Sequence, residues 1–130
     1  MPQKPTSVVI SLDSDDRRVL VGAQIALSDD GNIVGKGDMR AQIEQVWKNI
    51  RASLKAAGAK ASDIILTRAY VTDAHAKQNA DLRSEYLGPE SPTSTVNTVP
   101  KLPAGPDYLI EIEAVANLNS ATSASATPEQ

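Results

Sequence analysis

The apolar positions of this chain change their spacing along the sequence, and these changes predict where strands and helices lie. Two apolar runs, 8–13 and 18–25, are rich in β-branched residues and flank an acidic turn, which is typical of a β-hairpin. Further runs with the length and composition of strands span 63–72, 94–99 and 108–118. The pattern therefore predicts a protein with a substantial β-sheet.

A helix is predicted between the second and third strands. Apolar side chains recur there at steps of three and four residues, which places them on one helical face. They are Met39, Ile43, Val46, Trp47, Ile50, Leu54 and Ala57. Asp38 is a suitable N-cap and Gly58 supplies the stop. A second helix with a thin apolar face is predicted over 73–87, ending at Gly88 and Pro89.

The predicted order of elements is β-β-α-β-α-β-β, which indicates the α+β class. Two helices cannot cover both faces of such a sheet, so we expect both of them on one face. The 130 residues suit one domain, which we place at 1–118. Residues 119–130 are mostly Ser, Ala and Thr, and they are predicted to form a disordered tail.

The fifth predicted strand alternates between two kinds of side chain. Its even positions are apolar or small and suit packing under the helices: Tyr108, Ile110, Ile112, Ala114 and Ala116. Its odd positions set Glu111 and Glu113 between Leu109 and Val115. Carboxylates buried without partners would be costly. The odd positions therefore face either open solvent or a partly buried subunit interface that contains a wet cleft.

Composition excludes several classes of site. The chain has no cysteine, which excludes disulfides and a cysteine nucleophile, and its one histidine, His75, excludes a His-rich metal site. Sixteen acidic against 13 basic residues give a net charge of −3, which argues against a nucleic-acid groove. No apolar run is long enough to span a membrane, and no signal peptide is visible. We expect a cytoplasmic protein.

Several segments share their order and spacing with one known family. They read GAQI at 22–25, QVWKNI within 45–59, SDI at 62–64, YVTD at 70–73 and YLIEIEAVA within 102–116. Together they resemble the Rid family, the reactive-intermediate deaminases, over residues 8–118. The resemblance implies a chorismate-mutase-like fold and a homotrimer with clefts between subunits. It also implies hydrolysis of small enamines and imines to 2-oxo acids and ammonia without a cofactor.

The resemblance also implies candidate site residues. The family's site glutamate matches Glu111, its backbone segment on the second strand matches 22–24 with Ala23 and Gln24, and its helix-two asparagine matches Asn79. Ser94 stands where deaminating members carry an arginine that clamps the substrate carboxylate, so the chain resembles an arginine-lacking branch.

The fourth strand offers neutral hydrogen-bonding groups in place of that arginine. Ser94 and Thr95 are either ligand donors or plain strand residues. A neutral hydrogen bond is weaker than a charged, bidentate clamp. The sequence therefore favours a substrate that is neutral or differently charged.

Charged residues near the expected cleft each have two interpretations. Glu111 is either a base that positions water or a carboxylate in an intersubunit salt bridge, and Glu113 is interpreted as mainly structural. Arg68 is predicted to pair with a glutamate, with a substitute anion clamp as the alternative. His75 is interpreted as part of a solvated helix start.

Two functions of different classes remain. The first is a cofactor-independent hydrolase or isomerase acting on a small enamine, imine or enol in an intersubunit cleft. The second is a non-catalytic trimer that binds a small metabolite or a protein partner. Neither function involves nucleic acid or a membrane.

Overall fold

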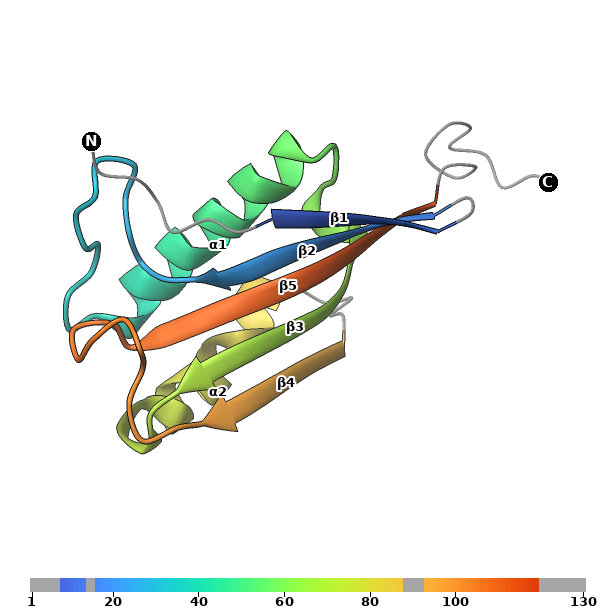
Figure 1. Cartoon of the computed structure of the whole chain (residues 1–130). Helices are drawn as coiled ribbons and strands as arrows, with labels where there is room; N and C mark the ends of the chain where they lie inside the picture. The colour runs from blue at the N-terminus through green and yellow to red at the C-terminus, as the bar shows by residue number, and fades with distance from the viewer. Residues whose placement is uncertain (1–7, 14–15, 88–92, 120–130) are drawn as a thin grey trace.

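The computed structural model describes residues 8–13, 16–87 and 93–119. Its elements follow the predicted order (Figure 1). They are β1 (Val8–Asp13), β2 (Asp16–Gln24), α1 (Met39–Ala56), a 3₁₀ turn (Ala61–Asp63), β3 (Ile64–Val71), α2 (Asp73–Leu87), β4 (Thr93–Thr98) and β5 (Ile110–Asn119). Asn119 belongs to β5, so this strand runs one residue further than predicted. The predicted turn at 14–15, the stop at 88–89 and the tail at 120–130 lie outside the described residues.

The strands form one sheet in the order β1-β2-β5-β3-β4. Neighbouring strands are antiparallel except β3 and β4, which are parallel because α2 carries the chain back between them. The last strand of the chain therefore lies at the centre of the sheet. Residues on β5 have neighbours on both sides, from β2 and from β3.

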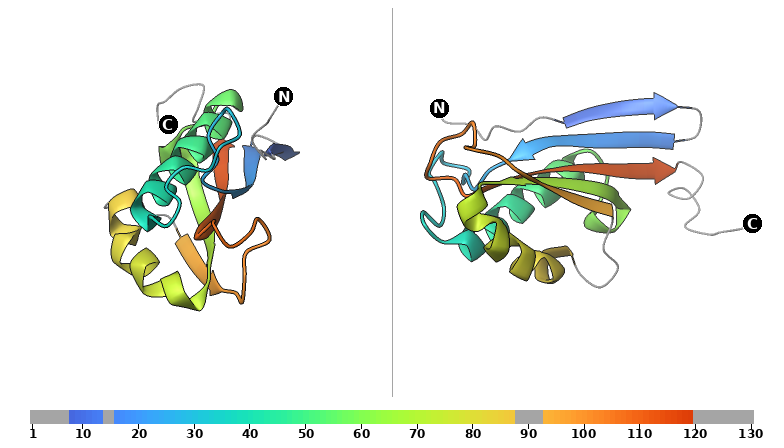
Figure 2. Two further views of the ribbon diagram at one scale, coloured as in Figure 1. Left: turned by 90° about the vertical axis from the view of Figure 1, so that its left-hand side faces the viewer. Right: turned by 90° about the horizontal axis from the view of Figure 1, so that it is seen from below.

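Both helices cover one face of the sheet, and the opposite face carries no described helix (Figure 2). Helix α1 packs on β5 and β2, whereas α2 packs on α1 and β3. The connection between β4 and β5 projects on the opposite face (Figure 2). The predicted α+β arrangement, with two helices on one side, is confirmed.

Helix α1 is held by its ends and by its apolar stripe. The Asp38 carboxylate accepts the Ala41 N–H at 3.1 Å, as expected of an N-cap. Gly58 has φ +83°, a left-handed conformation that favours glycine after a helix. The predicted stripe is buried from Met39 to Leu54, with Ala57 only partly buried.

Strand β5 separates the two faces as its sequence predicts. Ile110, Ile112, Ala114 and Ala116 lie under the helices and are at most 1% exposed. The residues between them point to the other side of the sheet. This opposite side, formed by the odd positions of β5 and their register partners, is called the open face below.

Candidate functional site

The open face gathers charged side chains from neighbouring strands. Across the β3–β5 register, Glu113 lies opposite Arg68 and Glu111 lies opposite Tyr70. Thr95 on β4 is the register partner of Arg68 on its other side. Register partners point to the same side of a sheet, so these residues share the open face.

Arg68 and Glu113 form an ion pair on this face. Arg68 Nη1 lies 2.5 Å from Glu113 Oε1, and the two side chains are 43% and 26% exposed. The prediction that Arg68 pairs with a glutamate is confirmed. Glu113 thus has a cationic partner within its own chain.

Glu111 lies in a different environment, only two residues away along the same strand. It is 9% exposed. Burial raises the pKa of the Glu111 carboxyl, and the charge of Glu113 raises it further, while a backbone hydrogen bond from Ala104 lowers it. Ala104 belongs to the β4–β5 loop, residues 99–109, which therefore reaches the acid on the open face. A raised pKa brings a carboxyl closer to the range in which it can both give and take a proton during catalysis.

The bulge in β2 lies beside these carboxylates. Val21 pairs with Ala114 and Gln24 with Ile112, so Gly22 and Ala23 together oppose the single residue between them, Glu113. Such a bulge interrupts the regular ladder of backbone hydrogen bonds. A small hollow of about 160 Å³ lies here. Its lining includes Leu20, Gly22, Arg68, Glu113 and Val115.

Gln24 supports the bulge from the helix-covered side. Its side chain is fully buried, and its register partner Ile112 lies under the helices. The Gln24 amide Nε2 donates to the Gly22 carbonyl at 3.0 Å. Within one protomer, Gln24 therefore shapes the backbone of the bulge from the face opposite Glu111.

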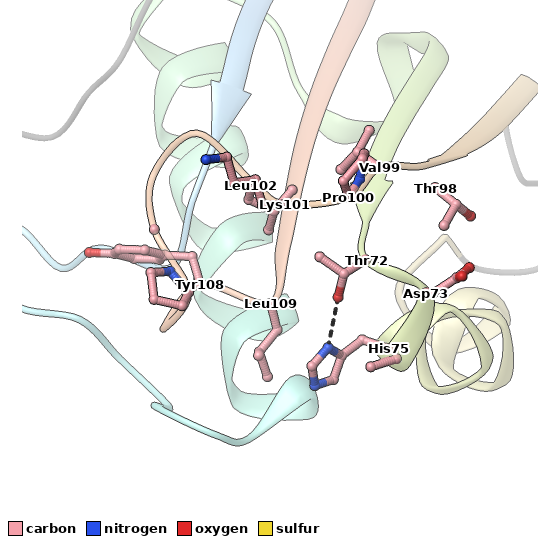
Figure 3. A pocket seen from close by; sticks show the side chains of 13 residues that line it. Thr72, Asp73, His75, Thr98, Val99, Pro100, Lys101, Leu102, Tyr108 and Leu109 are labelled. Carbon is pink, nitrogen blue, oxygen red and sulfur yellow. Dashed lines mark hydrogen bonds between the residues drawn. The ribbon is translucent and has the colours of Figure 1, made fainter.

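A larger hollow of about 720 Å³ opens at the end of the sheet where β3 stops and α2 begins (Figure 3). The β4–β5 loop lines its other side, with Lys101 and Tyr108 among the lining residues. The Thr72 hydroxyl and His75 Nδ1 are hydrogen-bonded at 3.1 Å. His75 lies in the first turn of α2, as interpreted from the sequence, and this partly exposed residue is hydrogen-bonded to Thr72. The three-residue spacing of Thr72 and His75 at a helix start is the sequence feature that could have predicted this hydrogen bond.

Comparison with known proteins identifies the group to which this sheet and its acid belong. The family model described as Endoribonuclease L-PSP matches residues 7–118. A RutC family protein of Pyrococcus abyssi is 36% identical over 100 residues, which are 75% of this chain and 76% of the relative. The chain belongs to the Rid family. The membership predicted from the resemblance is confirmed.

Solved structures agree with this Rid family assignment. The Rid family protein YyfB of Yersinia pestis has 34% identity and a TM-score of 0.67, with 78% of each chain covered. The RidA structure of an Antarctic Psychrobacter has a TM-score of 0.69 over 84% of this chain and 85% of that one. Its 22% identity shows the shared fold alone. The chorismate-mutase-like fold expected for a Rid protein is therefore present.

The candidate residues carried over from the Rid resemblance fall on two sides of the sheet. Glu111, Thr95 and the bulge at Ala23 are associated with the open face. Ser94 is in register with Thr67, which lies under the helices, so Ser94 points to the helix-covered side. Asn79, on α2, is fully buried. One protomer therefore does not bring Ser94, Gln24 and Asn79 together with Glu111.

Among the described residues, no group of three or more His, Asp or Glu side chains is placed to hold a metal ion. Neither helix, over the residues described, is long and apolar enough to cross a membrane.

Proposed function

We propose that this Rid family chain is a cofactor-independent hydrolase of the deaminase type. Its substrate is a small enamine or imine, and its cleft is completed when three copies associate through their open faces. The observation that carries the proposal is Glu111, a buried carboxyl with a raised pKa on an otherwise open face. An acid that is sheltered and easily protonated can serve proton transfer.

Glu111 has two proton transfers to perform in this reaction. The protonated carboxyl gives its proton to the enamine β-carbon, which converts C=C–NH₂ into an iminium ion. The resulting carboxylate takes a proton from water as the water oxygen bonds to the iminium carbon. The carbinolamine then transfers a proton to its nitrogen, and the C–N bond breaks. In sum, enamine and water give a carbonyl compound and ammonia.

The raised pKa suits both halves of this cycle. A carboxyl is an effective general acid and base when both of its protonation states are populated near the working pH. Burial shifts Glu111 in that direction. With an enol substrate, the protonated carboxyl would give its proton to carbon, and the carboxylate would then take the hydroxyl proton, which yields the keto tautomer. An isomerase is therefore the related form of this proposal.

The arrangement of charges favours a substrate that is neutral or differently charged. The resemblance matches Ser94 to the position of the family's arginine, and Arg68 is already paired with Glu113. A substrate carboxylate would have to compete with Glu113 for the guanidinium. The acidic balance of the chain favours a small molecule over RNA as the substrate.

A non-catalytic trimer that binds a metabolite or a protein partner is the second candidate. The Arg68–Glu113 ion pair favours this second candidate, because an arginine that is already paired is less able to bind a substrate carboxylate. In that case Glu111 would hold a ligand or a partner subunit through hydrogen bonds and transfer no proton. The two candidates differ in the expected effect of removing the acid.

The test is ammonia release from a panel of imines generated from amino acids and from simple amines. Glu111→Gln keeps the shape and removes the acid, and we expect it to reduce kcat/KM by about 10²- to 10⁴-fold. Glu113→Gln is the matched control, because it makes the same change two residues along the same strand. A turnover that both variants lower equally would contradict the role of Glu111. No turnover by the unmodified chain, together with thermal stabilisation by panel compounds, would favour the binding function.

A further inference from the structure

Residue Gln42 of α1 connects the helix layer to the loop that contacts Glu111. We propose that Gln42 is a positioning residue: it anchors the β4–β5 loop so that the loop stays closed over Glu111. This inference rests on the proposed function for its catalytic meaning. The anchoring itself can be tested without any substrate.

The Gln42 side chain is fully buried and makes hydrogen bonds in two directions. Its Nε2 donates to the Asp107 carbonyl at 2.8 Å and to the Gly35 carbonyl at 3.1 Å. Its Oε1 accepts the Leu109 N–H at 2.7 Å. Both amide hydrogens and the amide oxygen are thus used. A single side chain therefore holds the end of the β4–β5 loop on both sides of Tyr108.

The anchored end of the loop is linked to its middle by consecutive turns. The Tyr108 N–H donates to Gly105 O at 3.2 Å, and the Gly105 N–H donates to Leu102 O at 3.1 Å. Leu102 is 4% exposed, so the start of the loop is also packed. Ala104, which hydrogen-bonds Glu111, lies between these two fixed points. Fixing Asp107 and Leu109 therefore limits where Ala104 can move.

The same glutamine also holds the loop between β2 and α1. Gly35 has φ +76°, and a Cβ at this position would lie 2.6 Å from the Ala41 Cβ. Only glycine lets this loop approach the helix closely enough for the Gly35 carbonyl to meet Gln42. Gln42 thus ties two connections, far apart in sequence, to the first turns of α1.

Asn49 provides a natural comparison on the same helix. It is also buried, and its Nδ2 donates to Ile25 O at 3.0 Å and to Leu27 O at 2.9 Å. Those carbonyls belong to the β2–α1 connection alone. Asn49 therefore serves as a buried amide with a similar hydrogen-bonding task and no contact to the β4–β5 loop in these bonds.

Several charged or titratable groups surround Glu111 and must be considered in the test. Glu113 is on the same strand, and Arg68 and Tyr70 lie on β3. The loop itself carries Lys101 and Asp107, and the Asp107 carboxylate pairs with Lys36 at 3.7 Å. None of these side chains is altered in the variants below. A change in the titration midpoint of Glu111 would therefore reflect a change in the position of the β4–β5 loop.

The experiment combines amide hydrogen exchange with a ¹³C-carboxyl NMR titration of the full chain. Gln42→Met and Asn49→Leu each replace a buried amide by an apolar group of similar size. With Gln42→Met we expect exchange at 104–109 to accelerate by about fivefold to 150-fold, the effect of losing both hydrogen bonds to the loop. The Glu111 midpoint should fall, because the loss of burial, the largest cause of its raised pKa, outweighs the loss of the Ala104 hydrogen bond, which lowers that pKa. Asn49→Leu should change neither quantity.

Defined results overturn the inference. An unchanged Glu111 midpoint and unchanged exchange at 104–109 in Gln42→Met would show that the loop holds itself closed. Equal changes in both variants would show a general loss of stability. If Gln42→Met does not fold, hydrogen exchange of the unmodified chain still tests the anchoring. The inference requires the Leu109 amide to exchange as slowly as the amides in the interior of β5. A loss of turnover with an unmoved midpoint would also contradict positioning, whatever the substrate.

Discussion

The two faces of β5 show how one strand can serve two purposes. On the helix-covered face, Ile110, Ile112, Ala114 and Ala116 are all but completely buried. On the open face, Glu113, Val115 and Asn117 are partly exposed, and Glu111 is nearly covered. Both faces share one backbone, so the difference arises because the helices cover one face and not the other.

This contrast separates stability from chemistry. The buried face gains free energy from apolar contacts that tolerate little change of volume. The open face keeps an acid, an ion pair and a bulge, which we expect to contribute less to the stability of one protomer. Substitutions on the two faces should therefore change stability by different amounts, and these changes should depend differently on protein concentration and on pH.

The largest effect is expected at Ile112. Ile112→Ala should lower the free energy of unfolding by about 2–5 kcal/mol, since it opens a cavity in a packed core. Val115→Ala on the open face should cost about 1 kcal/mol in dilute solution, because less of its surface is buried. Urea unfolding followed by fluorescence of Trp47, the only tryptophan, measures both. Equal losses in dilute solution would mean that the two faces are packed alike.

The next effect concerns association. Leu20 is 38% exposed and lies opposite Val115 on the open face. If open faces meet in a trimer, Leu20→Asp should reduce the solution mass from three times 13.8 kDa to that of one folded chain. Ala52→Asp adds the same charge on the exposed side of α1 and should leave the mass unchanged. Sedimentation velocity distinguishes them, and a protomer mass for the unmodified chain would remove the proposed cleft.

A smaller effect is expected at the Arg68–Glu113 pair. Both side chains are partly exposed, so a double-mutant cycle with alanine at each position should give a coupling of about 0.2–1 kcal/mol. Salt should weaken this coupling by screening. A coupling of several kcal/mol that resists salt would indicate that the pair is buried in an assembly, which would sharpen the case for an interface.

Much of the fold was predictable because its signals are local. The three- and four-residue spacing in α1 and the two-residue alternation in β5 each fix which side chains are buried. The capping of α1 by Asp38 also follows from residues within one turn. Such features depend on neighbours along the chain and are visible in the sequence.

The site was less predictable because its contacts are non-local. Gln42 and Asp107 are 65 residues apart, and no spacing rule connects them. The cover over Glu111 comes from a loop whose path the sequence does not specify. The orientation of Ser94 follows from the pairing of β4 with β3, and a shift of one residue would have placed it on the open face. Local patterns identify the faces, whereas tertiary contacts decide which residues meet.

The smallest effect, and the one whose sign is most informative, concerns Glu111 and pH. Its folded pKa is raised above the ordinary value of 4.5, so the folded state binds this proton more tightly than the unfolded state does. Folding stability from this group is therefore greatest at low pH and declines as pH rises from 4.5 through the raised pKa. Glu111→Gln should raise the melting temperature at neutral pH, and this gain should disappear below pH 4.5.

Glu113→Gln serves as the control for that sign, because it removes the partner of Arg68 and should not stabilise at neutral pH. A melting temperature lowered by Glu111→Gln at neutral pH would show that its ionised form is favourably bound in the folded protein. The proposed proton-transfer role would then lose its physical basis. A stabilised but inactive Glu111→Gln variant, in contrast, would show that this carboxyl is kept for its chemistry at the expense of stability.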